Sequence, residues 1–115
     1  MEKIIWYLKT GIKLPMLAED IGPIEIHFIK KTICNYFNLG INDINGKSRK
    51  RKLVIARQLM HYFARKNTTH SLKEIGFHCG NRDHATVMYS YKTILNDIIY
   101  DDEVRYHHNQ LIDLL

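Results

Sequence analysis

The sequence predicts one all-α domain whose helices pack on a single core. Apolar residues recur at helical spacing in several segments after residue 26, and no segment after residue 28 shows the alternation of a strand. A length of 115 residues suits one domain, and 45% hydrophobic residues is ordinary for a folded protein. We expect residues 26–115 to form this domain. Residues 1–25 are read as an N-terminal extension whose structure the sequence does not assign, because Pro15, Gly22 and Pro23 interrupt its pattern and leave a short helix, a loop and an extended piece all possible.

The first predicted helix begins near Ile26 and precedes a strongly basic segment. Ile26, Ile29 and Ile33 share one helical face, and the Asn- and Gly-rich stretch "NLGINDING" predicts the end of this helix. The next segment, "KSRKRKLVIAR" at residues 47–57, contains six lysine and arginine residues and no acidic residue. Such a concentration on a chain of net charge +5 indicates a localised contact with a polyanion. A solvated loop is the alternative.

A second helix is predicted over roughly residues 53–66. Its apolar stripe consists of Ala56, Leu59, Met60, Phe63 and Ala64. Arg57, His61 and Arg65 lie four residues apart, which predicts that a different face of the helix is polar and cationic. Residues 67–70 are predicted to form a linker.

A short helix and a long helix follow, joined by a tight turn. Ser71 and Glu74 have the spacing of a capping box, and Gly80 is placed to end the short helix in a left-handed conformation. The apolar residues of the long helix are Val87, Tyr91, Ile94, Leu95 and Ile98. This is the layout of a helix-turn-helix. The final stretch "VRYHHNQLIDLL" predicts one more helix, packed through Val104, Leu111, Ile112 and Leu115.

The first turn of the second helix of a helix-turn-helix contacts base edges in DNA. Here that turn reads "RDHAT", residues 82–86. Asp83 can accept a hydrogen bond from cytosine, His84 can donate to a purine or a phosphate, and the methyl group of Ala85 can contact thymine. Thr86 adds a hydroxyl group. For Asp83, helix capping is an equally good reading and is compatible with base contact.

The amino-acid sequence of these segments indicates a particular family, which the order of the helices alone does not. "SLKEIGFHCGNRDHATVMYSYKTI", with "KSRKRKLVIARQLMHYFARK" and "IKKTICNYF" upstream, resembles the C-terminal DNA-binding domain of the DnaA family of bacterial chromosomal replication initiators. The likeness covers roughly Ile26 to Asn96. It implies a Trp-repressor-like, all-α helix-turn-helix fold and binding of double-stranded DNA at a short A·T-rich box.

The resemblance and the basic segment together assign DNA contacts. Bases are expected to be read by Arg49 in the minor groove and, in the major groove, by Asp83, His84, Ala85 and Thr86. Phosphates are expected to be contacted by Lys47, Lys50, Arg51, Lys52, Arg57, Gln58, Arg65, Leu72, Lys73 and Arg82.

Four positions depart from the family pattern. Ala85 replaces a Thr, which predicts a relaxed or altered preference at one base pair. Asn81 replaces a Gly and tolerates left-handed geometry. Lys73 and Ala56 each stand where the family has Pro.

Other function classes have little support in the sequence. There is no G-x-x-x-x-G-K-[ST] loop, no nucleophile beside a base and no chelating spacing among the seven His residues, so we expect no nucleotide, cofactor, metal or catalysis. Without a membrane-length apolar run or a targeting segment, and with Cys34 and Cys79 read as reduced thiols, we expect a cytoplasmic, nucleoid-associated protein.

The biological role stays open between two classes. The first is sequence-specific DNA binding in origin recognition or transcription regulation. The second is an adaptor or competitor that acts on replication proteins, which are the candidate protein partners. A non-specific nucleic-acid binder is a further alternative.

Overall fold

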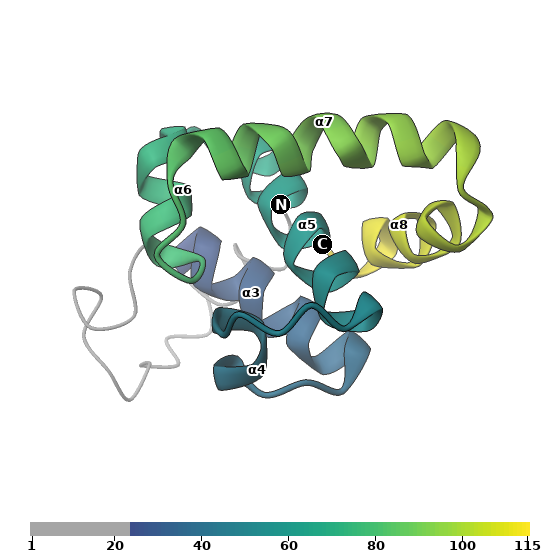
Figure 1. The fold of residues 1–115 in the computed structure, drawn as a ribbon, viewed down its shortest axis with the longest axis horizontal. Coiled ribbons are helices and arrows are strands. Elements are labelled where there is room, and N and C mark those ends of the chain that lie inside the picture. The colour runs from purple at the N-terminus through teal and green to yellow at the C-terminus, as the bar shows by residue number, and fades with distance from the viewer. Residues whose placement is uncertain (1–23) are drawn as a thin grey trace.

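The computed structural model describes residues 24–115, which form helices and no strand. Labelled as in Figure 1, the helices are α3 (Ile24–Phe37), α4 (Ile41–Asn45), α5 (Arg51–Asn67), α6 (Leu72–His78), α7 (His84–Tyr100) and α8 (Asp102–Leu114). The all-α helix-turn-helix prediction is confirmed. Of the predicted N-terminal extension, residues 1–23 lie outside the described residues, and Ile24 and Glu25 belong to α3.

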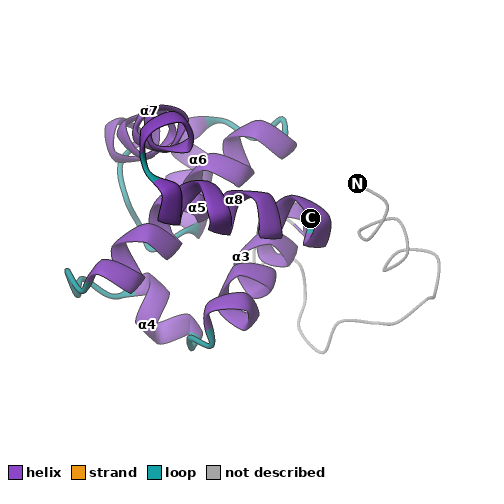
Figure 2. Ribbon diagram, turned by 90° about the vertical axis from the view of Figure 1, so that its right-hand side faces the viewer, coloured by secondary structure: helices purple, strands orange, loops and turns teal. Residues whose placement is uncertain are grey.

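Helix α5 is the centre of the domain. Helix α7 crosses over it in Figure 1, with α6 below the N-terminal end of α7 and α8 below its C-terminal end. Helices α3 and α4 pack against α5 from the side away from α7, as Figure 2 shows. The core between these layers includes Ile29, Leu59, Phe63 and Ile94, all almost inaccessible to solvent. The predicted apolar stripes therefore do meet in one core.

The segment between α3 and α5 is more ordered than the sequence predicts. Asn38 has a φ of 57° and ends α3, after which α4 makes one further turn and buries its residue Ile44 in the core. A helix of five residues is too short to show a period, which is why this stretch reads as a loop. Helix α5 also begins earlier than predicted, so Arg51 and Lys52 belong to its first turn.

The face of α5 predicted to be polar and cationic is mostly buried. Arg57 is 9% exposed and His61 is 2% exposed, and only Arg65 reaches solvent. The prediction was wrong because α4 and α7 cover this face and supply hydrogen-bond partners for both side chains. Buried polar groups are tolerated when they are bonded in this way.

The last two helices bury less apolar surface than predicted. Val104 and Leu111 are core residues, but Leu95 on α7 is 44% exposed and Ile112 on α8 is 47% exposed. Two helices that cross at one end leave the outer flank of each helix uncovered. Both cysteines, Cys34 and Cys79, are buried and form no disulfide. None of the helices within residues 24–115 has the length and hydrophobicity needed to cross a bilayer.

Candidate nucleic-acid interface

The first turn of α7 presents the predicted reading residues to solvent. Asp83 is the N-cap, and its carboxylate accepts a hydrogen bond of 2.7 Å from the amide of Thr86. This bond is the main reason that the pKa of Asp83 lies below its ordinary value. His84, Ala85 and Thr86 follow on the exposed surface of the helix. The capping role is therefore confirmed, and the side chains of residues 83–86 all remain exposed.

The turn before α7 is held by backbone geometry. Gly80 has a φ of 92° and Asn81 a φ of 52°, so two successive residues adopt the left-handed conformation. The chain then doubles back, and the amide of Arg82 donates to the carbonyl of Gly76 at 2.8 Å. A Cβ atom on Gly76 would lie 2.1 Å from the carbonyl oxygen of Arg82. Glycine at position 76 is therefore required for the close approach of α6 and the turn.

Helix α6 begins with the predicted capping box. Ser71 Oγ accepts from the amide of Glu74, and the Glu74 carboxylate accepts from the amide of Ser71. These hydrogen bonds hold the pKa of Glu74 below its ordinary value. Leu72 is half-buried against the core and Lys73 is exposed beside it. The cap fixes the N-terminus of α6, where the phosphate contact of Leu72 is predicted.

The basic loop, which we define as residues 46–50, is held by a buried arginine. Arg57 donates from Nε to the carbonyl of Ile44 at 2.8 Å and from Nη2 to that of Asp43 at 3.1 Å, and its Nη1 bonds to the carbonyl of Ser48. Burial, and then the nearby charge of Arg82, lowers the pKa of Arg57 from its ordinary value. In the structure, Arg57 therefore stabilises the conformation of the loop. The predicted contact between Arg57 and a phosphate stays a prediction.

A second arginine ties the basic loop to the turn. Arg82 Nη2 donates to the carbonyl of Gly46 across 36 positions of sequence, and Gly80 lies next to Asn45. The loop and the first turn of α7 are therefore neighbours on one surface. On this surface the side chains of Lys47, Arg49 and Lys50 are exposed. The prediction had placed Arg82 near phosphates, and the structure shows it half-buried and engaged with the loop.

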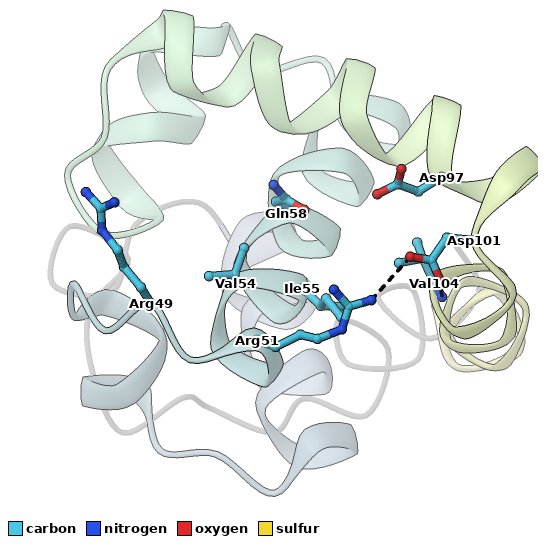
Figure 3. A pocket seen from close by; sticks show the side chains of 8 residues that line it. All are labelled: Arg49, Arg51, Val54, Ile55, Gln58, Asp97, Asp101 and Val104. Carbon is cyan, nitrogen blue, oxygen red and sulfur yellow. Dashed lines mark hydrogen bonds and ion pairs between the residues drawn. The ribbon is translucent and has the colours of Figure 1, made fainter.

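Arg49 and Arg51 leave this region in different directions. Figure 3 shows Arg51 extended toward Asp101, with Arg49 on the opposite side, away from the acidic residues. Arg51 Nη2 lies 3.2 Å from Asp101 Oδ2, and Arg51 Nε lies 3.4 Å from Glu103 Oε1. Within residues 24–115, Arg51 is thus paired with carboxylates, whereas Lys47, Lys50 and Lys52 form no ion pair there. Lys52 is exposed.

The remaining predicted residues on α5 lie toward α7. Gln58 is half-buried and lines the hollow drawn in Figure 3 between the basic segment and the end of α7. Arg65 is exposed, and its guanidinium lies 6.0 Å from the centre of the Tyr91 ring. Tyr91 stacks on Tyr62 with ring centres 5.4 Å apart. Packing, which the sequence favoured for Tyr91, is confirmed.

Tyr89 is a candidate contact that the sequence reading missed. No DNA contact is predicted for this ring from the sequence, and Tyr89 is 67% exposed. It lies one helical turn after Ala85, so both side chains share a face of α7. The spacing of four residues from Ala85 was the available signal. Tyr89 thereby extends the exposed face of α7 beyond its first turn.

The buried residue His61 connects α5 to α7 and to the turn that precedes α7. His61 Nδ1 lies 3.0 Å from Ser90 Oγ on α7, and its Nε2 lies 3.4 Å from the carbonyl of Cys79 at the start of the turn. Burial lowers the pKa of His61 to about 4, so the ring is neutral at neutral pH. Burial likewise raises the pKa of the Cys79 thiol to about 12. Within residues 24–115, no cluster of three His, Cys, Asp or Glu side chains could hold a metal ion.

Comparison with known proteins agrees with this geometry. The model of the bacterial dnaA protein helix-turn-helix family matches residues 26–94. The chain is similar to chromosomal replication initiator proteins DnaA from Chlorobaculum tepidum (39% identical over 86% of this chain and 20% of the relative), Flavobacterium psychrophilum (40%, 71% and 17%) and Wolbachia sp. subsp. Brugia malayi (41%, 85% and 21%).

These matches lie within one part of much longer proteins, because the chain spans about a fifth of the length of the curated relatives. The matched residues contain most of α3 and of α7 and all of α4 to α6, including the turn and the basic loop. The chain belongs to the bacterial DnaA helix-turn-helix family and has that family's DNA-binding fold.

Proposed function

We propose that this protein binds double-stranded DNA in a sequence-specific manner, at a short A·T-rich site similar to a DnaA box. One observation carries the proposal. The exposed basic loop and the first turn of α7 are fixed side by side, because Arg82 bonds to the carbonyl of Gly46 and Arg57 bonds to the carbonyl of Ser48 within the loop. Two elements in this relation can occupy adjacent grooves of one duplex.

In this proposal the first turn of α7 contacts the major groove, and the basic loop contacts the minor groove. Asp83, His84, Ala85 and Thr86 offer an acceptor, a ring donor, a methyl group and a hydroxyl group to the major groove. Arg49 extends from the loop and fits the narrow minor groove of an A·T-rich stretch. Sequence preference comes from these five side chains.

Affinity comes chiefly from the cations around them. Of the ten predicted phosphate-contacting residues, the exposed cations are Lys47, Lys50, Arg51, Lys52, Arg65 and Lys73. Contacts of this kind with phosphates release counterions and do not depend on sequence. The affinity should therefore fall steeply with salt, whereas the preference for the box should not.

The proposed biological role is origin recognition or transcription regulation without catalysis or nucleotide binding, in the cytoplasm at the nucleoid. The similarity to replication initiators supports the DNA target, and the sequence contains no phosphate-binding loop of the P-loop type. Replication proteins are candidate partners.

A fluorescence-anisotropy titration tests this function. A duplex containing a DnaA-type box and a scrambled duplex of equal composition are titrated at several salt concentrations. We expect binding of the box to be at least about tenfold tighter at moderate salt. Equal binding of both duplexes would identify a non-specific nucleic-acid binder instead. Failure to bind either one at low salt would reject DNA binding and favour the adaptor role.

A further inference from the structure

In the part of the chain that the structure describes, Arg51 is the one cation of the basic segment, residues 47–57, that forms ion pairs with acidic residues. Asp101 and Glu103 lie 50 and 52 positions later in the sequence, at the start of α8, and both contact its guanidinium. The Arg51 side chain is nevertheless 65% exposed, so DNA phosphates can reach it. The same group is therefore available to two kinds of anion.

The carboxylate of Asp101 is held in place independently of Arg51. Its Oδ1 caps α8 by accepting from the amides of Glu103 at 3.0 Å and Val104 at 3.2 Å, and its Oδ2 faces Arg51. Exposed ion pairs are usually weak partly because two flexible side chains must be ordered. Here the N-cap has already ordered one of them, which favours the pair.

The charge distribution around α5 gives the pair a further reason to form. Helix α5 begins with Lys50 as its N-cap and Arg51 and Lys52 in its first turn, and it has no acidic residue there. Cations at this end oppose the helix dipole. Asp101 and Glu103 supply from α8 the negative charge that the first turn of α5 lacks.

We propose that Asp101 and Glu103 position Arg51 away from DNA and so reduce the phosphate contribution to binding. The inference rests on the proposed DNA-binding function. A phosphate must displace the two carboxylates before Arg51 can contact it, and the displaced carboxylates then lie near the duplex. Because phosphate contacts do not depend on sequence, the two acids set the overall affinity and leave the preference for the box unchanged.

The variant Asp101→Asn/Glu103→Gln tests this proposal. Asn is as good an N-cap as Asp, so α8 keeps its cap while the charge is removed. Asp102→Asn is the matched control, since Asp102 belongs to the same helix end but pairs with Arg105 instead of Arg51. Each variant is also made in an Arg51→Ala background. Affinity is measured by anisotropy on the box and scrambled duplexes over a range of salt.

We expect the double variant to bind both duplexes roughly three- to tenfold more tightly at low salt, with a salt slope steeper by about one unit. The control should change affinity less than about twofold, because its charge is removed at the same helix end without freeing Arg51. The gain of the double variant should disappear in the Arg51→Ala background. The inference is overturned by an unchanged affinity, by an equal gain in the control, or by a gain that persists without Arg51.

A measurement without DNA separates this inference from the proposed function. The pKa of Asp101 lies below its ordinary value, mainly through the hydrogen bond from Val104 and in part through Arg51. In an NMR titration, Arg51→Ala should raise this pKa, whereas an unchanged titration would show that the pair does not form. A wild-type protein that binds neither duplex would reject the proposed function and the inference with it, and the titration would still decide whether the pair exists.

Discussion

The basic loop and the turn between α6 and α7 lie side by side, yet they are stabilised in opposite ways. The turn relies on its own backbone, with left-handed residues at Gly80 and Asn81 and a hydrogen bond from Arg82 to Gly76. The loop relies on a side chain from elsewhere, because Arg57 bonds to two carbonyls of α4 just before the loop and to the carbonyl of Ser48 within it. The turn requires a residue without a Cβ atom at position 76, and the loop requires the complete guanidinium group of Arg57.

Because of this difference, the turn and the loop tolerate different substitutions. The turn can change its outward side chains freely as long as Gly76 and the left-handed pair remain. The loop can change its own residues, but it depends on a buried residue of α5. Substitutions at Gly76 and Arg57 should therefore break the two segments one at a time, by different physical routes.

The largest effect is expected for Gly76→Ala. Alanine would normally favour a helix by about 1 kcal/mol, but its Cβ would lie 2.1 Å from the Arg82 carbonyl oxygen. We expect a loss of about 3 kcal/mol or more in the free energy of unfolding, measured with urea, because backbone must move.

Gly40→Ala is the control for this prediction. A Cβ there would meet only the Asp43 carboxylate, at 3.4 Å, in ordinary extended backbone. Its effect should stay within about 1 kcal/mol. Similar losses at positions 76 and 40 would contradict the close approach that defines the turn.

Arg57→Lys should break the loop and keep the charge. An ammonium group cannot reach three carbonyls with the geometry of a guanidinium, so at least one buried acceptor loses its partner. We expect a loss of about 2 kcal/mol in unfolding free energy. DNA affinity should fall as well, because the loop is no longer fixed beside the turn.

Arg65→Lys provides the comparison on the same helix, since Arg65 is exposed. Its effect on stability should be below about 0.5 kcal/mol. If Arg57→Lys were equally mild, the buried guanidinium would not be what holds the loop.

Acidification should lower the free energy of unfolding through His61, the buried histidine between α5, α7 and the turn. His61 is folded with a pKa of about 4 against an ordinary 6.5, so the unfolded chain binds more protons below pH 6.5. Its contribution is complete above that pH and declines as the pH falls toward 4. Between pH 7.5 and 5 the free energy of unfolding should drop by about 2 kcal/mol.

The variant His61→Gln isolates this effect. Burial also lowers the pKa of His27 and His78, which are less buried than His61, so a smaller dependence of the same sign should remain. Urea unfolding at the two pH values measures both proteins. A pH dependence as large as that of the wild type would assign it to other groups.

The ends of α6 and the start of α7 could be predicted because their signals are local. Ser71 and Glu74 form the expected capping box, and Gly80 and Asn81 adopt the expected left-handed conformation. Asp83 caps α7 as proposed. In each case the residues that interact lie within a few positions of one another, so the spacing alone carries the information.

The burial of polar residues could not be predicted in the same way. Arg57 and His61 have the spacing of a solvated face, and their burial depends on α4 and α7 being packed against that face. The partner of Arg51 lies at the far end of the chain. The spacing of residues in a single sequence does not reveal such long-range pairs. A helix as short as α4 is missed for another reason, because five residues show no helical period.

The candidate site was predictable as a set of residues but not as an arrangement. The exposed positions His84, Ala85 and Arg49 were all named from the sequence. That Arg82 links the loop to the turn emerges only from the fold, since Gly46 is 36 positions away. The exposure of Tyr89 was missed because an aromatic residue in a helix is more often part of the core.

The most direct test of the account compares His84→Ala with Lys50→Ala on the box and scrambled duplexes over a range of salt. If the turn reads bases and the loop contacts phosphates, His84→Ala should cost about 1–3 kcal/mol on the box and little on the scrambled duplex. Lys50→Ala should instead weaken both duplexes alike and make the salt slope shallower by about one unit. Equal losses on the two duplexes for His84→Ala, with an unchanged slope for Lys50→Ala, would contradict this division of roles.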